Sequence, residues 1–71
     1  MIKSRINVRL AERDMTQKDL SALTGISQSA ISNLHRGVAK QLPFEDLNAL
    51  CKVFSCQPSD LFVYIEDEEA Q

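Results

Sequence analysis

The chain has few of the residues that build redox, metal and membrane sites. Its 71 residues include two cysteines, one histidine, two glycines, two prolines and no tryptophan. No apolar run approaches the roughly 18 residues that a bilayer span needs. The N-terminal stretch MIKSRINVRL also lacks the apolar block of a signal peptide. We therefore expect a cytoplasmic protein with no membrane partner.

The scarcity of cysteine and histidine also limits the chemistry. Cys51 and Cys56 are too widely spaced for a CxxC redox pair, and His35 is distant from both in the sequence. A zinc site takes about four ligands, so we expect no metal and no cofactor. Cys51 is expected to pack as a small hydrophobe and Cys56 as a half-buried thiol. The chain also lacks a glycine-rich phosphate loop and a nucleophile paired with a base, so an enzyme is the remotest interpretation.

Charge is divided unevenly along the chain. With 44% hydrophobic and 25% charged residues, the composition predicts one soluble domain over residues 1–71. Residues 1–40 hold seven cations against three acids, whereas residues 41–71 hold one lysine against seven acids. This asymmetry indicates that one end faces a polyanion. The sequence pI near 5.2 argues against it, because domains that bind phosphates are commonly basic throughout. Charge alone therefore leaves the question open.

The first two predicted helices are bounded by capping signals. Asn7 is expected to cap a first helix that runs to about Asp14. Thr16 caps the second, and Asp19 follows three residues later in a capping-box arrangement. Gly25 ends that helix, because glycine readily takes the positive φ of a helix C-terminus.

Three further helices are predicted towards the C-terminus. Ser27 caps a third helix that ends at Gly37. Pro43 suits the first turn of a fourth helix over residues 44–54, and Pro58 opens a short fifth helix. The fourth helix carries a core stripe with helical spacing, made of Leu47, Leu50, Cys51 and Phe54.

The two ends of the chain resemble strands more than helices. Ile2 and Ile6 alternate with polar residues, and the β-branched or aromatic residues 63–65 lie near the other end. We predict that the termini pair as a small antiparallel ribbon or exchange strands between subunits. In the alternative, Ile2 and Ile6 extend the first helix and the tail frays.

The third helix presents a polar face without acids. Wound at about 100° per residue, its polar side chains fall in one arc of roughly 140°, opposite Ala30, Ile31 and Leu34. A solvated face in an acidic protein usually mixes glutamate with lysine. An acid-free face suits the DNA major groove, where Gln and Asn can pair with adenine and an acid would be repelled by phosphates. The arc consists of Gln28, Ser29, Ser32, Asn33 and Arg36.

Two short helices joined through Gly25 make a helix-turn-helix over about residues 16–37. The stretches MTQKDLSALTGISQSAISNLHRG and LNALCKVFSCQPSDLF resemble the Cro and phage-repressor type of helix-turn-helix regulator, the Xre family. The positions that match the family pattern are Gln17, Gly25, Ile31 and Leu34. Ser21 and Thr24 depart from it, since the family usually has alanine and an aliphatic residue there. The resemblance implies an all-α, compact five-helix, lambda-repressor-like DNA-binding domain from a bacterium or phage.

The resemblance also implies roles for individual residues. Base reading falls to Ser27, Gln28, Ser29, Ser32 and Asn33. Contacts to the DNA backbone fall to Gln17, Lys18, Arg36, Lys40 and Gln41. In the alternative, Gln17 is a plain surface residue. For Lys18, Arg9 and Arg13, the residues themselves favour solubilising the protein or pairing with nearby acids over contact with phosphate. The acidic tail, residues 66–71, is expected to be a frayed solubilising end, with a DNA mimic or a regulatory element as the other interpretations.

The predicted function is sequence-specific binding of double-stranded DNA as a transcriptional regulator. We expect a homodimer on a palindromic operator and no small-molecule ligand. Repression is favoured, although activation stays open because it depends on where the operator lies relative to a promoter. The rival interpretation is a helix-turn-helix module that binds protein, such as an antitoxin or an anti-repressor partner.

Overall fold

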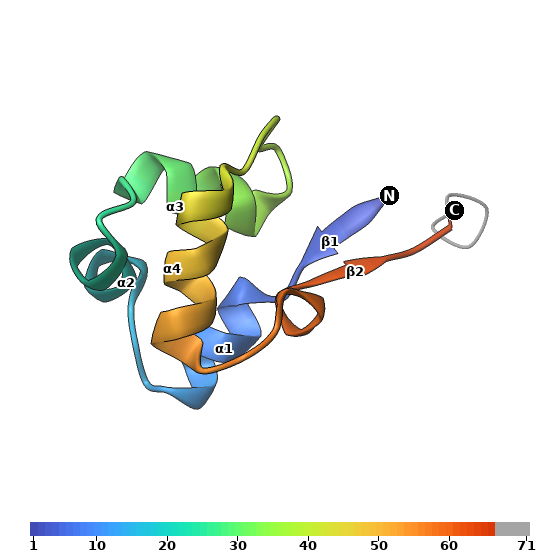
Figure 1. The fold of residues 1–71 in the computed structure, drawn as a ribbon. Helices are drawn as coiled ribbons and strands as arrows, with labels where there is room; N and C mark the ends of the chain where they lie inside the picture. The colour runs from blue at the N-terminus through green and yellow to red at the C-terminus, as the bar shows by residue number, and fades with distance from the viewer. Residues whose placement is uncertain (67–71) are drawn as a thin grey trace.

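A computed structural model describes residues 1–66; residues 67–71, which hold most of the predicted acidic tail, lie outside the described residues. Four α-helices pack together, and a two-stranded ribbon formed by the two ends of the chain projects from them (Figure 1). The elements in chain order are β1 (Ile2–Ser4), α1 (Ile6–Glu12), α2 (Gln17–Thr24), α3 (Gln28–Arg36), α4 (Phe44–Phe54), a 3₁₀ turn η1 (Pro58–Asp60) and β2 (Phe62–Tyr64).

The prediction of five helices is wrong at its last member. Residues 58–60 form a single 3₁₀ turn, in which the Leu61 amide donates to the Pro58 carbonyl at 3.0 Å. The Asp60 carboxylate accepts a bond from the Gln57 amide at 2.9 Å and closes this turn at its start. The chain then enters β2 at Phe62, so strand pairing takes the residues that a fifth helix would need.

The capping signals of α2 and α3 are confirmed. The Thr16 hydroxyl accepts a bond from the Asp19 amide at 3.1 Å, and the Asp19 carboxylate accepts one from the Thr16 amide at 3.0 Å. That second bond lowers the pKa of Asp19 below its ordinary value. Gly25 and Gly37 end the two helices with φ of 80° and 76°, in the left-handed region that favours glycine.

The start of α1 differs from the prediction. The helix begins at Ile6 with Arg5 in the N-cap position, so Asn7 lies inside the first turn and does not cap it. The Ser4 hydroxyl, two residues before the helix, accepts a bond from the Ile6 amide at 3.1 Å. At the other end α1 stops at Glu12, two residues before the predicted Asp14. The N-cap lies two residues before the predicted Asn7 because β1 fixes the path of the chain into the helix.

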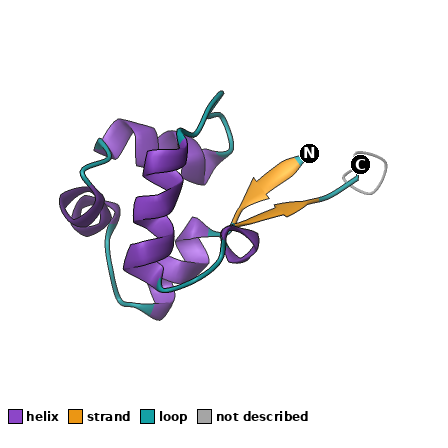
Figure 2. Ribbon diagram, in the orientation of Figure 1, coloured by secondary structure: helices purple, strands orange, loops and turns teal. Residues whose placement is uncertain are grey.

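The ribbon confirms that the termini pair within the chain. The antiparallel register sets Ile2 opposite Tyr64, Lys3 opposite Val63 and Ser4 opposite Phe62. Below the ribbon, the Arg5 amide donates to the Leu61 carbonyl at 2.7 Å. Figure 2 shows the two strands leaving the helices together. In the alternative, Ile2 and Ile6 extend the first helix: Ile6 does begin α1, but Ile2 lies in β1, so the alternative is wrong for Ile2.

Every helix and the end of η1 contribute to one buried cluster. Arg9 of α1 and Arg13, which follows the end of α1, tie the C-terminal half of the chain to this helix: Arg9 donates to the Asp60 carbonyl at 3.2 Å, and Arg13 to the Phe54 carbonyl at 2.7 Å. Among the helices within residues 1–66, none has the length and apolar character that crossing a membrane requires. The buried residues are Ile6, Leu10, Leu20, Ile26, Ile31, Leu34, Leu50, Phe54 and Leu61.

The predicted core stripe of α4 is only half buried. The helix has the predicted bounds, with Pro43 in the N-cap position just before it. Leu50 and Phe54 lie in the core, whereas Leu47 and Cys51 are partly exposed. The stripe therefore spans the edge of the core and continues onto the surface.

Candidate nucleic-acid interface

Helix α3 is held against the protein by its apolar underside. Ile31 and Leu34 are buried and Ala30 packs against the core, as the helical spacing predicts. At its N-terminus the Ser27 hydroxyl accepts a bond from the Ala30 amide at 3.1 Å. Gly37 closes the other end, where its amide donates to the Leu34 carbonyl. Both ends of the helix are therefore fixed, and its polar side is left for a ligand.

The turn between α2 and α3 is held by two hydroxyls. Ser21 donates to the Ile26 carbonyl, and Thr24 donates to the Leu20 carbonyl at 2.8 Å. The Thr24 hydroxyl also accepts a bond from the Ile26 amide at 3.1 Å. Because Ile26 is buried, these bonds satisfy backbone groups that water cannot reach. Ser21 and Thr24, which depart from the Xre pattern, thus fix the angle at which α3 leaves the turn.

The predicted base-reading residues lie together on the outer side of α3. Gln28, Ser29 and Asn33 are exposed, and Ser32 is partly exposed. Ser27 is also exposed, but its hydroxyl oxygen is already engaged as the helix cap. The structure therefore gathers the polar arc as predicted and gives Ser27 a structural role at its edge.

The predicted backbone-contacting residues divide into three places. Lys40 and Gln41 line a groove between α3 and the start of α4, and this groove also includes Asn33. Arg36 lies at the C-terminal end of α3. Gln17 and Lys18 occupy the first turn of α2, where Gln17 is partly buried and Lys18 exposed. Lys40 and Gln41 share their groove with Asn33, a predicted base-reading residue.

Strand β1 adds a cation that the sequence left without a role. Lys3 and Ser4 line a hollow together with His35 and Arg36 of α3. Among the described residues the His35 Nδ1 atom is buried without a hydrogen-bond partner. No local signal marks Lys3 in the sequence, because only the pairing of β1 with β2 brings it beside the end of α3.

The geometry can be compared with known proteins. Residues 5–67 match the model of the Cro/C1-type HTH DNA-binding domain. This chain belongs to that family. Over 64 residues it is 41% identical to the uncharacterized HTH-type transcriptional regulator YozG of Bacillus subtilis (strain 168), a match that covers 90% of this chain and 76% of that protein. The Xre-type resemblance is confirmed, and the helix-turn-helix is a DNA-binding domain of a transcriptional regulator.

Acidic residues border this Cro/C1-type interface on one side. Glu45 and Asp46 occupy the first turn of α4, and Asp46 lines the same groove as Lys40. Carboxylates there complement the positive end of the helix dipole and weaken its attraction for phosphate. One cation each from α3, β1 and the loop after Gly37 lines a hollow beside this interface, namely Arg36, Lys3 and Lys40.

Arg9 of α1 and Arg13 just after it make their contacts within the domain. Arg9 forms an ion pair with Glu12, with its Nη1 atom 2.8 Å from the Glu12 Oε1 atom. The same hydrogen bond raises the pKa of Arg9 above its ordinary value. Both arginines therefore make contacts inside the domain, whereas Lys3, Arg36 and Lys40 line the hollows beside α3.

Proposed function

We propose that the chain is a repressor that binds a palindromic operator as a homodimer and reads it with α3. The observation that carries this proposal is the acid-free polar arc of α3, mounted on buried Ile31 and Leu34 in a chain of the Cro/C1-type family. A helix about 10 to 12 Å across fits the major groove of B-DNA. Occupation of an operator that overlaps a promoter excludes polymerase, so the protein needs no chemistry of its own.

Base reading is assigned to one amide pair and two hydroxyls. Gln28 and Asn33 each have an amide that can bond adenine at two positions, while Ser29 and Ser32 donate or accept at several bases. Ser27 lies at the entrance of the helix, where its hydroxyl caps α3 and keeps its hydrogen for a further bond. Specificity therefore rests mainly on Gln28 and Asn33.

Affinity is assigned to residues outside the arc. Phosphate contacts from about three groups per subunit would give a dimer a log-log salt slope near −5. Two α3 helices about 34 Å apart would address successive major grooves on one side of the DNA. The residues assigned to the backbone are Gln17, Lys18, Arg36, Lys40 and Gln41.

Selection of bound DNA from a random duplex pool tests this proposal. We expect a palindromic consensus, bound as two chains per duplex when the complex is sized. Replacing both Gln28 and Asn33 by alanine should remove the sequence preference, while far-UV circular dichroism stays that of the wild type. Asn7→Ala, an exposed amide on α1, is the matched control and should bind as the wild type does. Recovery of no consensus, or an unchanged preference in the double variant, would refute the assignment.

A protein-binding role is the second candidate, and the net charge of −2 favours it. In that case the α3 arc would contact a partner protein in place of DNA. A protein that copurifies with the chain and displaces operator DNA would support this role. A chain that binds its selected operator without such a competitor would speak against it.

A further inference from the structure

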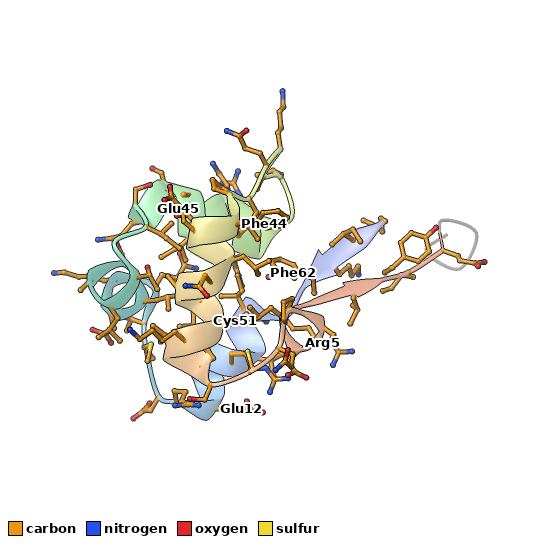
Figure 3. The ribbon with its side chains drawn as sticks, viewed as in Figure 1. Arg5, Glu12, Phe44, Glu45, Cys51 and Phe62 are labelled. Atoms are coloured by element: carbon orange, nitrogen blue, oxygen red, sulfur yellow. The ribbon has the colours of Figure 1, made fainter. Side chains whose placement is uncertain are left out.

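The most exposed large apolar side chain among residues 1–66 is Phe44, the first residue of α4. It is 87% exposed. Leu47 and Cys51 follow it at i+3 and i+7 on the same side of the helix, and both are partly exposed. Figure 3 shows Phe44 at one end of α4 and Cys51 further along the same helix. Single exposed apolar residues are common, but this one begins a continuous stripe.

The stripe forms one wall of a groove. Cys56 and Pro58 form the other wall, and the amides of Asn48 and Gln57 complete the lining. We call this surface, made of Phe44, Leu47, Cys51, Cys56 and Pro58, the α4 face. The described residues lining the groove include no aspartate, glutamate, lysine, arginine or histidine, and burial raises the pKa of Cys56 above its ordinary value. An apolar, charge-free centre with amides beside it is the usual make-up of a protein–protein interface.

Charges beside the stripe specify how a partner would lie. Glu45 and Lys52 are seven residues apart, or about 10 Å along the helix. Both project about 90° from Phe44 on the same side. If two copies pack α4 antiparallel about a two-fold axis, Glu45 of each copy lies next to the partner's Lys52. In a parallel two-fold pair, Glu45 and Lys52 of one copy lie on the opposite flank from those of the partner, so no such ion pair forms and the charges favour the antiparallel arrangement.

The ribbon offers a second apolar surface, through Ile2 at 59% exposure and Tyr64 at 67%. Its neighbouring hollows contain Lys3, Arg36 and Lys40. A two-fold contact there would bring cations of both copies together, without an acid among the described residues of those hollows to offset them. The α4 face has no such conflict.

We propose that the α4 face is the homodimer interface, in which a second copy packs its own α4 antiparallel across it. This inference rests on the proposed function, which requires a dimer. It adds the surface that joins the two subunits. None of the described residues lining the groove belongs to α3. The dimer therefore leaves both polar arcs available to the operator.

Sedimentation equilibrium without DNA tests the interface directly. The wild type is expected to dimerise, and Phe44→Asp to raise the dissociation constant of the dimer about 100-fold or more, because an aromatic contact is lost from both subunits and a charge takes its place. An aspartate in the first turn of α4 also suits the helix dipole, so the variant should keep its far-UV circular dichroism. Leu23→Asp, at a 61% exposed position on α2, is the matched control and should remain dimeric.

A charge exchange tests the arrangement of the two helices. Glu45→Lys and Lys52→Glu should each weaken the dimer about tenfold, since each creates two like-charge contacts. Combining both changes should restore the dimer to within about threefold of the wild type. If the combination is weaker than either single variant, the antiparallel arrangement is wrong.

Other outcomes would overturn the proposal as a whole. One is a wild type that stays monomeric at millimolar concentration. Another is a Phe44→Asp variant that stays dimeric, above all if Tyr64→Asp becomes monomeric. A dimeric Phe44→Asp protein would leave the α4 face to a partner of another kind. These measurements contain no DNA. A protein that dimerises through the α4 face but selects no operator would therefore refute the proposed function and leave the interface proposal standing.

Discussion

Helices α3 and α4 each expose a stripe of side chains, but the two stripes have opposite chemistry. The α3 arc is polar and acid-free, whereas the α4 face is apolar and uncharged. Both helices bury two large side chains beneath, Ile31 and Leu34 in one and Leu50 and Phe54 in the other. The contrast shows that the buried residues of a helix fix it to the core, while its exposed residues determine whether it can bind DNA or protein.

Salt should separate the two surfaces most strongly. Raising the salt concentration fourfold, with a slope near −5, should weaken operator binding about 1,000-fold, or about 4 kcal/mol. Dimerisation through the α4 face should change little over the same range, because its centre is apolar and salt screens mainly charges. Fluorescence anisotropy on operator DNA and sedimentation equilibrium measure the two in parallel. Equal salt dependence of both processes would contradict the assignment of the two surfaces.

Removing core support should affect α3 more than the outer stripe of α4. Ile31→Ala deletes a fully buried side chain and should lower the free energy of unfolding by about 3 kcal/mol in urea titrations. Leu47→Ala, at a partly exposed position, should cost the monomeric Phe44→Asp background about 1 kcal/mol. Using that background keeps subunit dissociation out of the comparison. Similar losses in the two variants would show that Leu47 belongs to the core and not to the α4 face.

The smallest expected effect concerns the N-terminal caps of α2 and α4. Helix α2, against which α3 packs, starts with the Thr16 and Asp19 capping box, whereas α4 starts after Pro43 without a side-chain cap. Because folding lowers the pKa of Asp19, its contribution to stability is present above the unfolded pKa of about 3.9 and is lost as the pH falls through the lower, folded value.

Unfolding of the wild type and of Asp19→Asn should therefore be compared across acidic pH. The wild type should lose more stability than the variant as the pH falls, because only the wild type loses this carboxylate. The difference between the two curves isolates Asp19 from the other acids. A constant difference at every pH would mean that the carboxylate does not contribute to the cap through its charge.

Local signals predicted the helical part of the domain well. The caps at Thr16 and Ser27, the left-handed ends at Gly25 and Gly37, and the bounds of α4 all lie where the sequence places them. Each of these signals acts within three to five residues, and the competing conformations are strained or leave backbone groups unpaired. The polar arc of α3 follows from the same short-range periodicity.

Contacts between distant segments decided the parts of the fold that local signals predicted wrongly. Because Ser4 pairs with Phe62, α1 starts earlier than predicted and the predicted fifth helix is a single turn. The same pairing places Lys3 beside Arg36, and no spacing in the sequence predicts that these two residues are neighbours. The sequence by itself determined the helix-turn-helix and the residues it displays, because capping and periodicity are local. Only the tertiary structure decided which side of α4 stays exposed and where the two ends of the chain lie, because these depend on contacts between residues up to about 60 positions apart.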